Sequence, residues 1–125
     1  MGVPSLQNAA LVALGAVPGA WLRYRLVDRL APLLPRRHWG TFAVNVAACF
    51  CLGLVTALIG RRGGDQRLSL LLATGFLGSL STFSSFSVEV LQAWLAGERR
   101  EALTLVTGSL AVGLLALTIG LEIGR

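Results

Sequence analysis

The sequence predicts an all-α integral membrane protein with four transmembrane helices, the third of them broken near its middle. Three observations predict this class. The 125-residue chain is 54% hydrophobic and only 14% charged, and its mean hydropathy of +0.71 is high for a soluble domain of this length. The apolar residues gather in four segments, and the connections between the segments are short and carry arginines. We therefore expect residues 1–125 to form a single four-helix transmembrane domain.

The first two segments have the length and composition of membrane-spanning helices. The first covers residues 6–22 and contains Gly15 and Gly19, a pair of small residues whose spacing permits close helix packing, with Pro18 between them as a source of a kink. The second covers residues 39–59. As a helix it is about 31 Å long, which matches the hydrocarbon core of a bilayer.

Asn45 lies inside the second segment, one helical turn after Thr41 and on the same face. An amide inside a membrane is expensive and usually has a partner. Two interpretations stay open, an interhelical hydrogen bond or an NH2 group that donates into an ion path. Arg23, four residues after Gly19, is either an arginine whose head group reaches the interface or a cation near the entrance that attracts anions.

The third segment, residues 68–95, is too long for one ordinary transmembrane helix and contains the run GFLGSLSTFSSFSVEV at 75–90. A continuous helix of this length would span about 42 Å. Gly75 and Gly78 weaken a helix, and the hydroxyl residues that follow offer other bonds to the backbone. We therefore expect a break here, and such breaks persist in membranes only where protein buries them or where they line a cavity.

After the expected break, helical spacing sorts the side chains into two stripes. Phe83 and Phe86 share one stripe, and Thr82, Ser85 and Glu89 share the other. Hydroxyls can replace the water shell of a small ion, and the positive edge of a phenyl ring can face an anion. The pattern predicts a small-ion path, with helix packing through serine and threonine as the alternative. Glu89 is a residue at the mouth of this path or a packing partner.

The fourth segment, residues 102–121, gains some polarity from Ser109. Seven arginines fall on the side of the first and third connections and four on the other side, so the positive-inside bias is modest and permits insertion in both orientations. The net charge of +5 forms no single patch, so we expect no nucleic-acid partner. We also expect no enzyme, because the sequence offers no nucleophile–base pair, metal cluster or phosphate loop.

The run GFLGSLSTFSSFSVE resembles the motif G-F-C-G-G-L-T-T-F-S-T-F-S-x-E of the Fluc (CrcB-type) fluoride channels. GAVPGAWLRY and GTFAVNVAACFCLG give weaker supporting matches, and the resemblance covers nearly the whole chain. It implies an antiparallel homodimer of dual topology in the lipid bilayer of the bacterial inner membrane, with two pores for passive fluoride export. A heterodimer with a paralogue stays open.

The resemblance also implies roles for individual residues. A central structural Na+, which is not transported, would be held by the backbone carbonyls of Gly78 and Ser81. Arg23 would lie towards the vestibule, where we also expect Glu89. The chain departs from the family motif at Ser79, which stands where the family has glycine. The fluoride path would be lined by Asn45, Thr82, Phe83, Ser85, Phe86 and Ser109.

Two other functions stay open from the residues alone. A small multidrug-type, proton-coupled transporter would have a similar size, but that class needs a membrane-embedded acid, typically in its first helix, and residues 6–22 contain none. A non-conducting membrane assembly protein needs no ion path. That function leaves the alternation of phenylalanines and hydroxyls unexplained.

Overall fold

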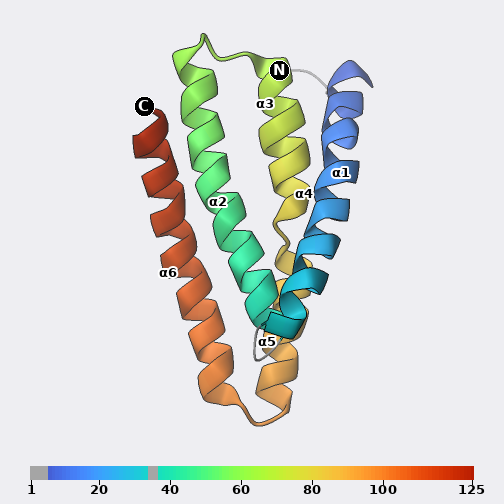
Figure 1. Ribbon diagram of the computed structural model, residues 1–125, viewed down its shortest axis with the longest axis vertical. Helices are drawn as coiled ribbons and strands as arrows, with labels where there is room; N and C mark the ends of the chain where they lie inside the picture. Colours follow the sequence, from blue (N-terminus) through green and yellow to red (C-terminus); the bar gives the residue numbers. More distant parts are fainter. Residues whose placement is uncertain (1–5, 34–36) are drawn as a thin grey trace.

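The computed structural model describes residues 6–33 and 37–125, and of residues 37, 38, 84 and 85 it describes the backbone alone. The described ranges are helical and contain no strand. Three long helices, α1 (Leu6–Leu30), α2 (Arg37–Arg61) and α6 (Arg99–Gly124), stand beside a composite rod of shorter helical pieces (Figure 1). A short 3-10 turn, η1 (Ala31–Leu33), follows α1.

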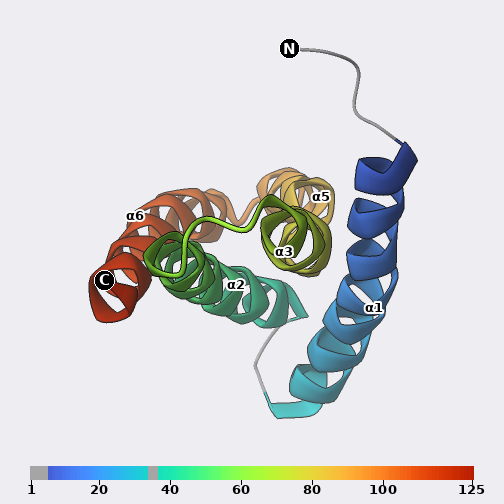
Figure 2. The same cartoon turned by 90° about the horizontal axis from the view of Figure 1, so that it is seen from above.

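The composite rod occupies the third apolar segment of the sequence. It consists of α3 (Gln66–Ser69), a π-helical stretch η2 (Leu70–Leu77), α4 (Gly78–Leu80) and, after an interruption, α5 (Phe83–Leu95). Seen from above, α1 and α6 lie on opposite sides of the molecule, with α2 and the rod between them (Figure 2). The rod runs antiparallel to α2, so its lower half lies beside the beginning of α2.

Helix α1 continues well beyond the segment 6–22 that the sequence predicted, and this is a correction to the expected connection. The helix reaches Leu30 because its last turns have their own apolar face. Val27 is buried in the core, and Leu26 and Leu30 pack against the same cluster. The arginines between Arg23 and Arg29 therefore belong to a helix and not to a loop.

Helices α2 and α6 pack closely along most of their length, and glycines make this approach possible. A Cβ on Gly53 would overlap the carbonyl oxygen of Leu117, and a Cβ on Gly120 would overlap that of Phe50. The Cβ on Gly120 would also lie 2.8 Å from the backbone nitrogen of Leu54. Small residues at such contacts let two backbones come close and gain van der Waals energy, which is how apolar helices associate in lipid.

The outer surface of the single chain is strongly apolar. By length and composition, residues Trp39–Arg61 and Arg99–Gly124 form the two described helices that are suited to crossing a bilayer. A surface of this kind needs lipid or another chain to cover it. Large hydrophobic side chains that are more than half exposed occur on α1, α5 and α6, among them Leu14, Val17, Trp21, Leu95, Leu110, Leu114 and Ile123.

The substitution Gly120→Ala should destabilise the protein, because the new methyl group meets the Phe50 carbonyl and forces α6 away from α2. We expect a loss of about 1–3 kcal/mol in the free energy of unfolding, measured by thermal unfolding in detergent. Gly60→Ala is the matched control, since no atom lies within 4 Å of its new Cβ and alanine has the better helix propensity. Equal unfolding midpoints for the two variants would contradict the packing role.

Candidate functional site

The rod is interrupted at Ser81 and Thr82, which lie outside its helices. Ser81 has an extended backbone, with φ −78° and ψ 154°, so the chain leaves the helical path before α5 begins at Phe83. In a continuous helix the Thr82 N–H would donate to the carbonyl of Gly78, four residues earlier. In apolar surroundings each backbone group that loses its helical partner needs another one.

Asn45 on α2 supplies partners to both backbone groups of Thr82 with a single side chain. Its Nδ2 donates to the Thr82 carbonyl oxygen at 3.1 Å, and its Oδ1 accepts from the Thr82 N–H at 2.8 Å. The amide thus pairs with the backbone as a second peptide group would. Of the two interpretations that the sequence left open, the interhelical hydrogen bond is present. The Nδ2 group also carries a second N–H, which this pair does not use.

Helix α1 docks against the stretch just before the interruption through two glycine contacts. A Cβ on Gly75 would lie 3.1 Å from the Cα of Gly15, and a Cβ on Gly19 would overlap the Oγ of Ser79. The Ser79 hydroxyl donates to the carbonyl oxygen of Ala16 at 2.9 Å. Ser79 therefore fills the space left by Gly19 and joins α1 to the rod, two residues before the interruption begins.

Glu89 on α5 is half-buried against α2. The hydroxyl of Thr41, whose residue is only 3% exposed, donates to Glu89 Oε1 at 2.8 Å. Glu89 Oε2 is buried and has no hydrogen-bond partner among the described residues. A buried carboxylate oxygen of this kind is costly to leave alone, so the position suits contact with a water molecule or another hydrogen-bond donor.

The sequence places Thr41 on the same helix face as Asn45 but does not predict it as a site residue. The contact with Glu89 depends on how two segments align. On α2, Thr41 comes one turn before Asn45; on the rod, Glu89 comes two turns after Thr82. Because the two elements run in opposite directions, the pair Asn45–Thr82 brings Thr41 towards Glu89. The contact between Thr41 and Glu89 therefore follows from the pairing of Asn45 with Thr82.

Phe83 and Phe86 lie side by side on one face of α5. Their ring centroids are 6.4 Å apart, with the ring planes inclined by 47°. Phe83 is 80% exposed in the single chain, whereas Phe86 is half-buried. The two rings form part of an open groove, whose other lining residues are Ser87, Val90, Leu91, Trp94 and Val106.

The remaining expected site residues lie at several depths. The Ser81 hydroxyl donates back to the Leu77 carbonyl at 3.2 Å. Ser109 on α6 has a buried hydroxyl oxygen with no hydrogen-bond partner in the described part of the chain. Arg23 is half-buried on α1, one turn after Gly19. The side chain of Ser85 lies outside the described residues.

The fold and the site define an all-helical protein of the membrane type, with an uncharged polar interruption held between helices. The chain belongs to the family of CrcB-like proteins, described as Camphor Resistance (CrcB), whose model matches residues 10–121. This confirms the resemblance found in the sequence.

Several relatives match the chain over nearly its full length. The protein named "Fluoride-specific ion channel FluC 1" of Prochlorococcus marinus is 53% identical over 100% of this chain and 97% of its own length. A protein of the same name from Synechococcus sp. is 50% identical over 96% of this chain and 95% of its own. The "Fluoride-specific ion channel FluC" of Paracoccus denitrificans is 43% identical over 91% of each chain.

The substitution Asn45→Ala should lower the free energy of unfolding by about 2 kcal/mol or more. Two hydrogen bonds of about 1 kcal/mol each disappear, and both backbone groups of Thr82 lose a partner. The Thr82 amide should also exchange its hydrogen faster, which residue-resolved hydrogen exchange measures. Thr56→Ala, at an exposed position of α2, controls for loss of a polar group. Unchanged protection of the Thr82 amide in the Asn45 variant would refute the pairing.

Proposed function

We propose that this protein is a fluoride-selective ion channel that exports cytoplasmic fluoride passively across the bacterial inner membrane. The observation that carries the proposal is the full-length similarity to proteins named fluoride-specific ion channels, at up to 53% identity. The matched length includes the interruption and the helices on both sides of it. These names also agree with the expectation that the chain is not an enzyme.

The proposed path follows α5 past the interruption. The rings of Phe83 and Phe86 lie together, and phenyl ring edges carry partial positive charge that can face an anion without a fixed cation. The second N–H of Asn45 is available as a donor near the interruption. Buried polar atoms without partners support a path that water or an ion completes. The hydroxyl members of the proposed path are Thr82, Ser85 and Ser109.

The charged groups suit the wider ends of such a path. A carboxylate at Glu89 would repel an anion at close range, because the hydrogen bond from the neutral Thr41 hydroxyl leaves its negative charge in place. We therefore place Glu89 in a hydrated vestibule and not at the narrowest point. Arg23, half-buried on α1, would raise the local concentration of anions at a vestibule.

We further propose that each chain crosses the membrane four times, with the third span broken, and that two chains assemble as an antiparallel homodimer with two pores. Exposed apolar side chains on α1, α5 and α6 support contacts with lipid or a second copy. Phe83, at 80% exposure, is poorly enclosed by its own chain. A single chain thus offers one wall of a path, and a second copy would supply the opposite wall.

The backbone near the interruption fits the structural Na+ that the resemblance implies. Because Thr82 N–H donates to Asn45, the Gly78 carbonyl lacks the amide that would bond to it in a continuous helix and accepts from the Ser81 hydroxyl at 3.4 Å. Ser81 is extended, and its carbonyl precedes the first turn of α5. Backbone carbonyls at helix ends and interruptions coordinate Na+ in membrane proteins. Carbonyls from both copies would hold the ion, which would stabilise the dimer without being transported.

Fluoride efflux from liposomes that contain only this protein tests the proposed function. Potassium fluoride is loaded inside, valinomycin is added, and external fluoride is followed with an electrode; potassium chloride is the control. We expect rapid fluoride release without chloride release. Absence of release from a well-folded protein would overturn the proposal for this chain alone and favour a paralogue partner or an assembly function.

The substitutions Phe83→Ile and Phe86→Ile should each slow fluoride efflux by about tenfold or more while the protein stays folded. An aliphatic side chain lacks the positive ring edge, and a tenfold slower rate corresponds to about 1.4 kcal/mol in the barrier. Leu91→Ile, at another position of the same groove, is the control for a change in shape. Efflux at the wild-type rate in both phenylalanine variants would rule out the pore role of the rings.

A further inference from the structure

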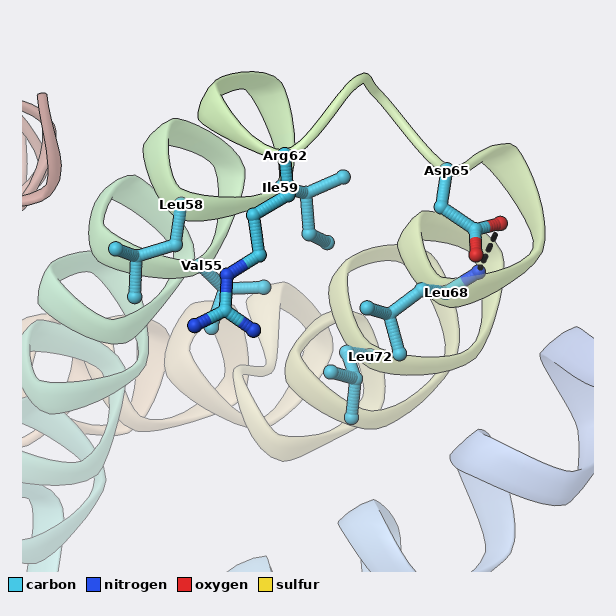
Figure 3. Close-up of a pocket in the computed structure, with 7 residues that line it drawn as sticks. All are labelled: Val55, Leu58, Ile59, Arg62, Asp65, Leu68 and Leu72. Carbon is cyan, nitrogen blue, oxygen red and sulfur yellow. Dashed lines mark hydrogen bonds between the residues drawn. The ribbon is translucent and has the colours of Figure 1, made fainter.

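A pocket lies between the end of α2 and the beginning of the rod, away from the interruption (Figure 3). Its volume is about 240 Å³. Thr41 is close to the opposite end of α2, about 30 Å along the helix axis from Arg62. The pocket is therefore separate from the site around Asn45 and Glu89. Its lining residues are Val55, Leu58, Ile59, Arg62, Asp65, Leu68 and Leu72.

The end of the molecule that carries this pocket has a net positive charge, because Arg61, Arg62 and Arg67 outnumber Asp65. Arg62 extends its guanidinium group into the space between α2 and the rod (Figure 3), and no hydrogen bond or ion pair joins that group to another side chain in the described ranges. Asp65 also lines the pocket and keeps its negative charge, but its Oδ1 accepts from the backbone N–H groups of Arg67 at 3.0 Å and Leu68 at 3.3 Å and forms no ion pair with Arg62. Arg61 and Arg67 are exposed near the same end.

The floor of the pocket is aliphatic. Leu58 on α2 and Leu68 on α3 both line the pocket and stay 39% and 40% exposed (Figure 3). Val55 lies two turns before Arg62 on α2, about 10 Å deeper along the helix. Figure 3 shows the Arg62 side chain extending back along α2 towards Val55, so the pocket places a guanidinium directly beside an apolar groove. This combination matches an anionic lipid head group and the acyl chain attached to it.

We propose that this pocket binds an anionic phospholipid. The lipid phosphate accepts hydrogen bonds from the Arg62 guanidinium, whose fork suits a phosphate, and the acyl chain lies against Leu58, Leu68 and Leu72. A soluble anion would use the guanidinium and leave the apolar groove unfilled. The proposal requires that the chain lies in a membrane, but it does not require fluoride conduction.

Binding of phosphatidylglycerol to the full-length protein in detergent tests this proposal. Lipid is titrated in mixed micelles, and the unfolding midpoint and the mass of the lipid-bound protein are measured. Phosphatidylcholine and inorganic phosphate are titrated in parallel. We expect phosphatidylglycerol to raise the midpoint and to stay bound in the mass spectrum, while inorganic phosphate does neither. Arg62→Gln should raise the half-saturating concentration of phosphatidylglycerol about tenfold, as expected for one lost charge-assisted contact.

Arg61→Gln is the matched control, because it removes the same charge from the preceding residue, which does not line the pocket. We expect it to leave the half-saturating concentration close to that of the wild type. An equal rise of this concentration in both variants would overturn the proposal in favour of general surface charge. No rise in either variant would overturn it in favour of coverage of the pocket by a second copy. The same shift with inorganic phosphate would also overturn it, in favour of a soluble-anion site. Fluoride flux plays no part in these readouts.

Discussion

The pair of hydrogen bonds between Asn45 and the backbone of Thr82 is the interaction on which the arrangement of the rod depends. An apolar environment gives a freed N–H or C=O no solvent partner, so an interrupted helix persists only if protein groups replace the lost bonds. The asparagine side chain carries a donor and an acceptor with the geometry of a peptide group. One residue on α2 therefore satisfies both groups of Thr82 and fixes the interruption at that height of the neighbouring helix.

The glycine contacts follow from the same constraint, because a side chain can reach a backbone only where helices approach closely. On one side, Gly15 and Gly75 bring α1 against the rod, and Ser79 extends from the rod to the α1 carbonyl of Ala16. On the other side, Gly120 brings α6 against α2. The rod that contains the interruption thus packs closely against α1, and α2, which supplies Asn45, packs closely against α6. The serine that stands in place of a motif glycine adds a bond here, and Gly19 leaves room for its hydroxyl.

Hydropathy and helical spacing predicted the helical class and the grouping of Phe83 with Phe86, because both follow from local patterns. They failed beyond residue 22, where arginines resembled a loop although Val27 and its neighbours bury an apolar face against α2. Spacing also assigned Asn45 to a face without naming its partner. The contact between Thr41 and Glu89 depends on how two antiparallel elements align, and no single segment of sequence contains that information.

The polar atoms that stay unpartnered in one chain bear on how the site is completed. Glu89 Oε2 and Ser109 Oγ are buried without partners in the described ranges, while Phe83 is 80% exposed. In a complete channel in lipid, we expect the buried oxygens to have hydrogen-bond partners and the rings that act on an ion to be enclosed. The combination is what one wall of a shared path requires: polar groups ready for water or an ion, and an aromatic face that a second copy can cover. The proposed dimer therefore accounts for the exposed rings, whereas the two oxygens, which one chain already buries, suit a water molecule or an ion inside it.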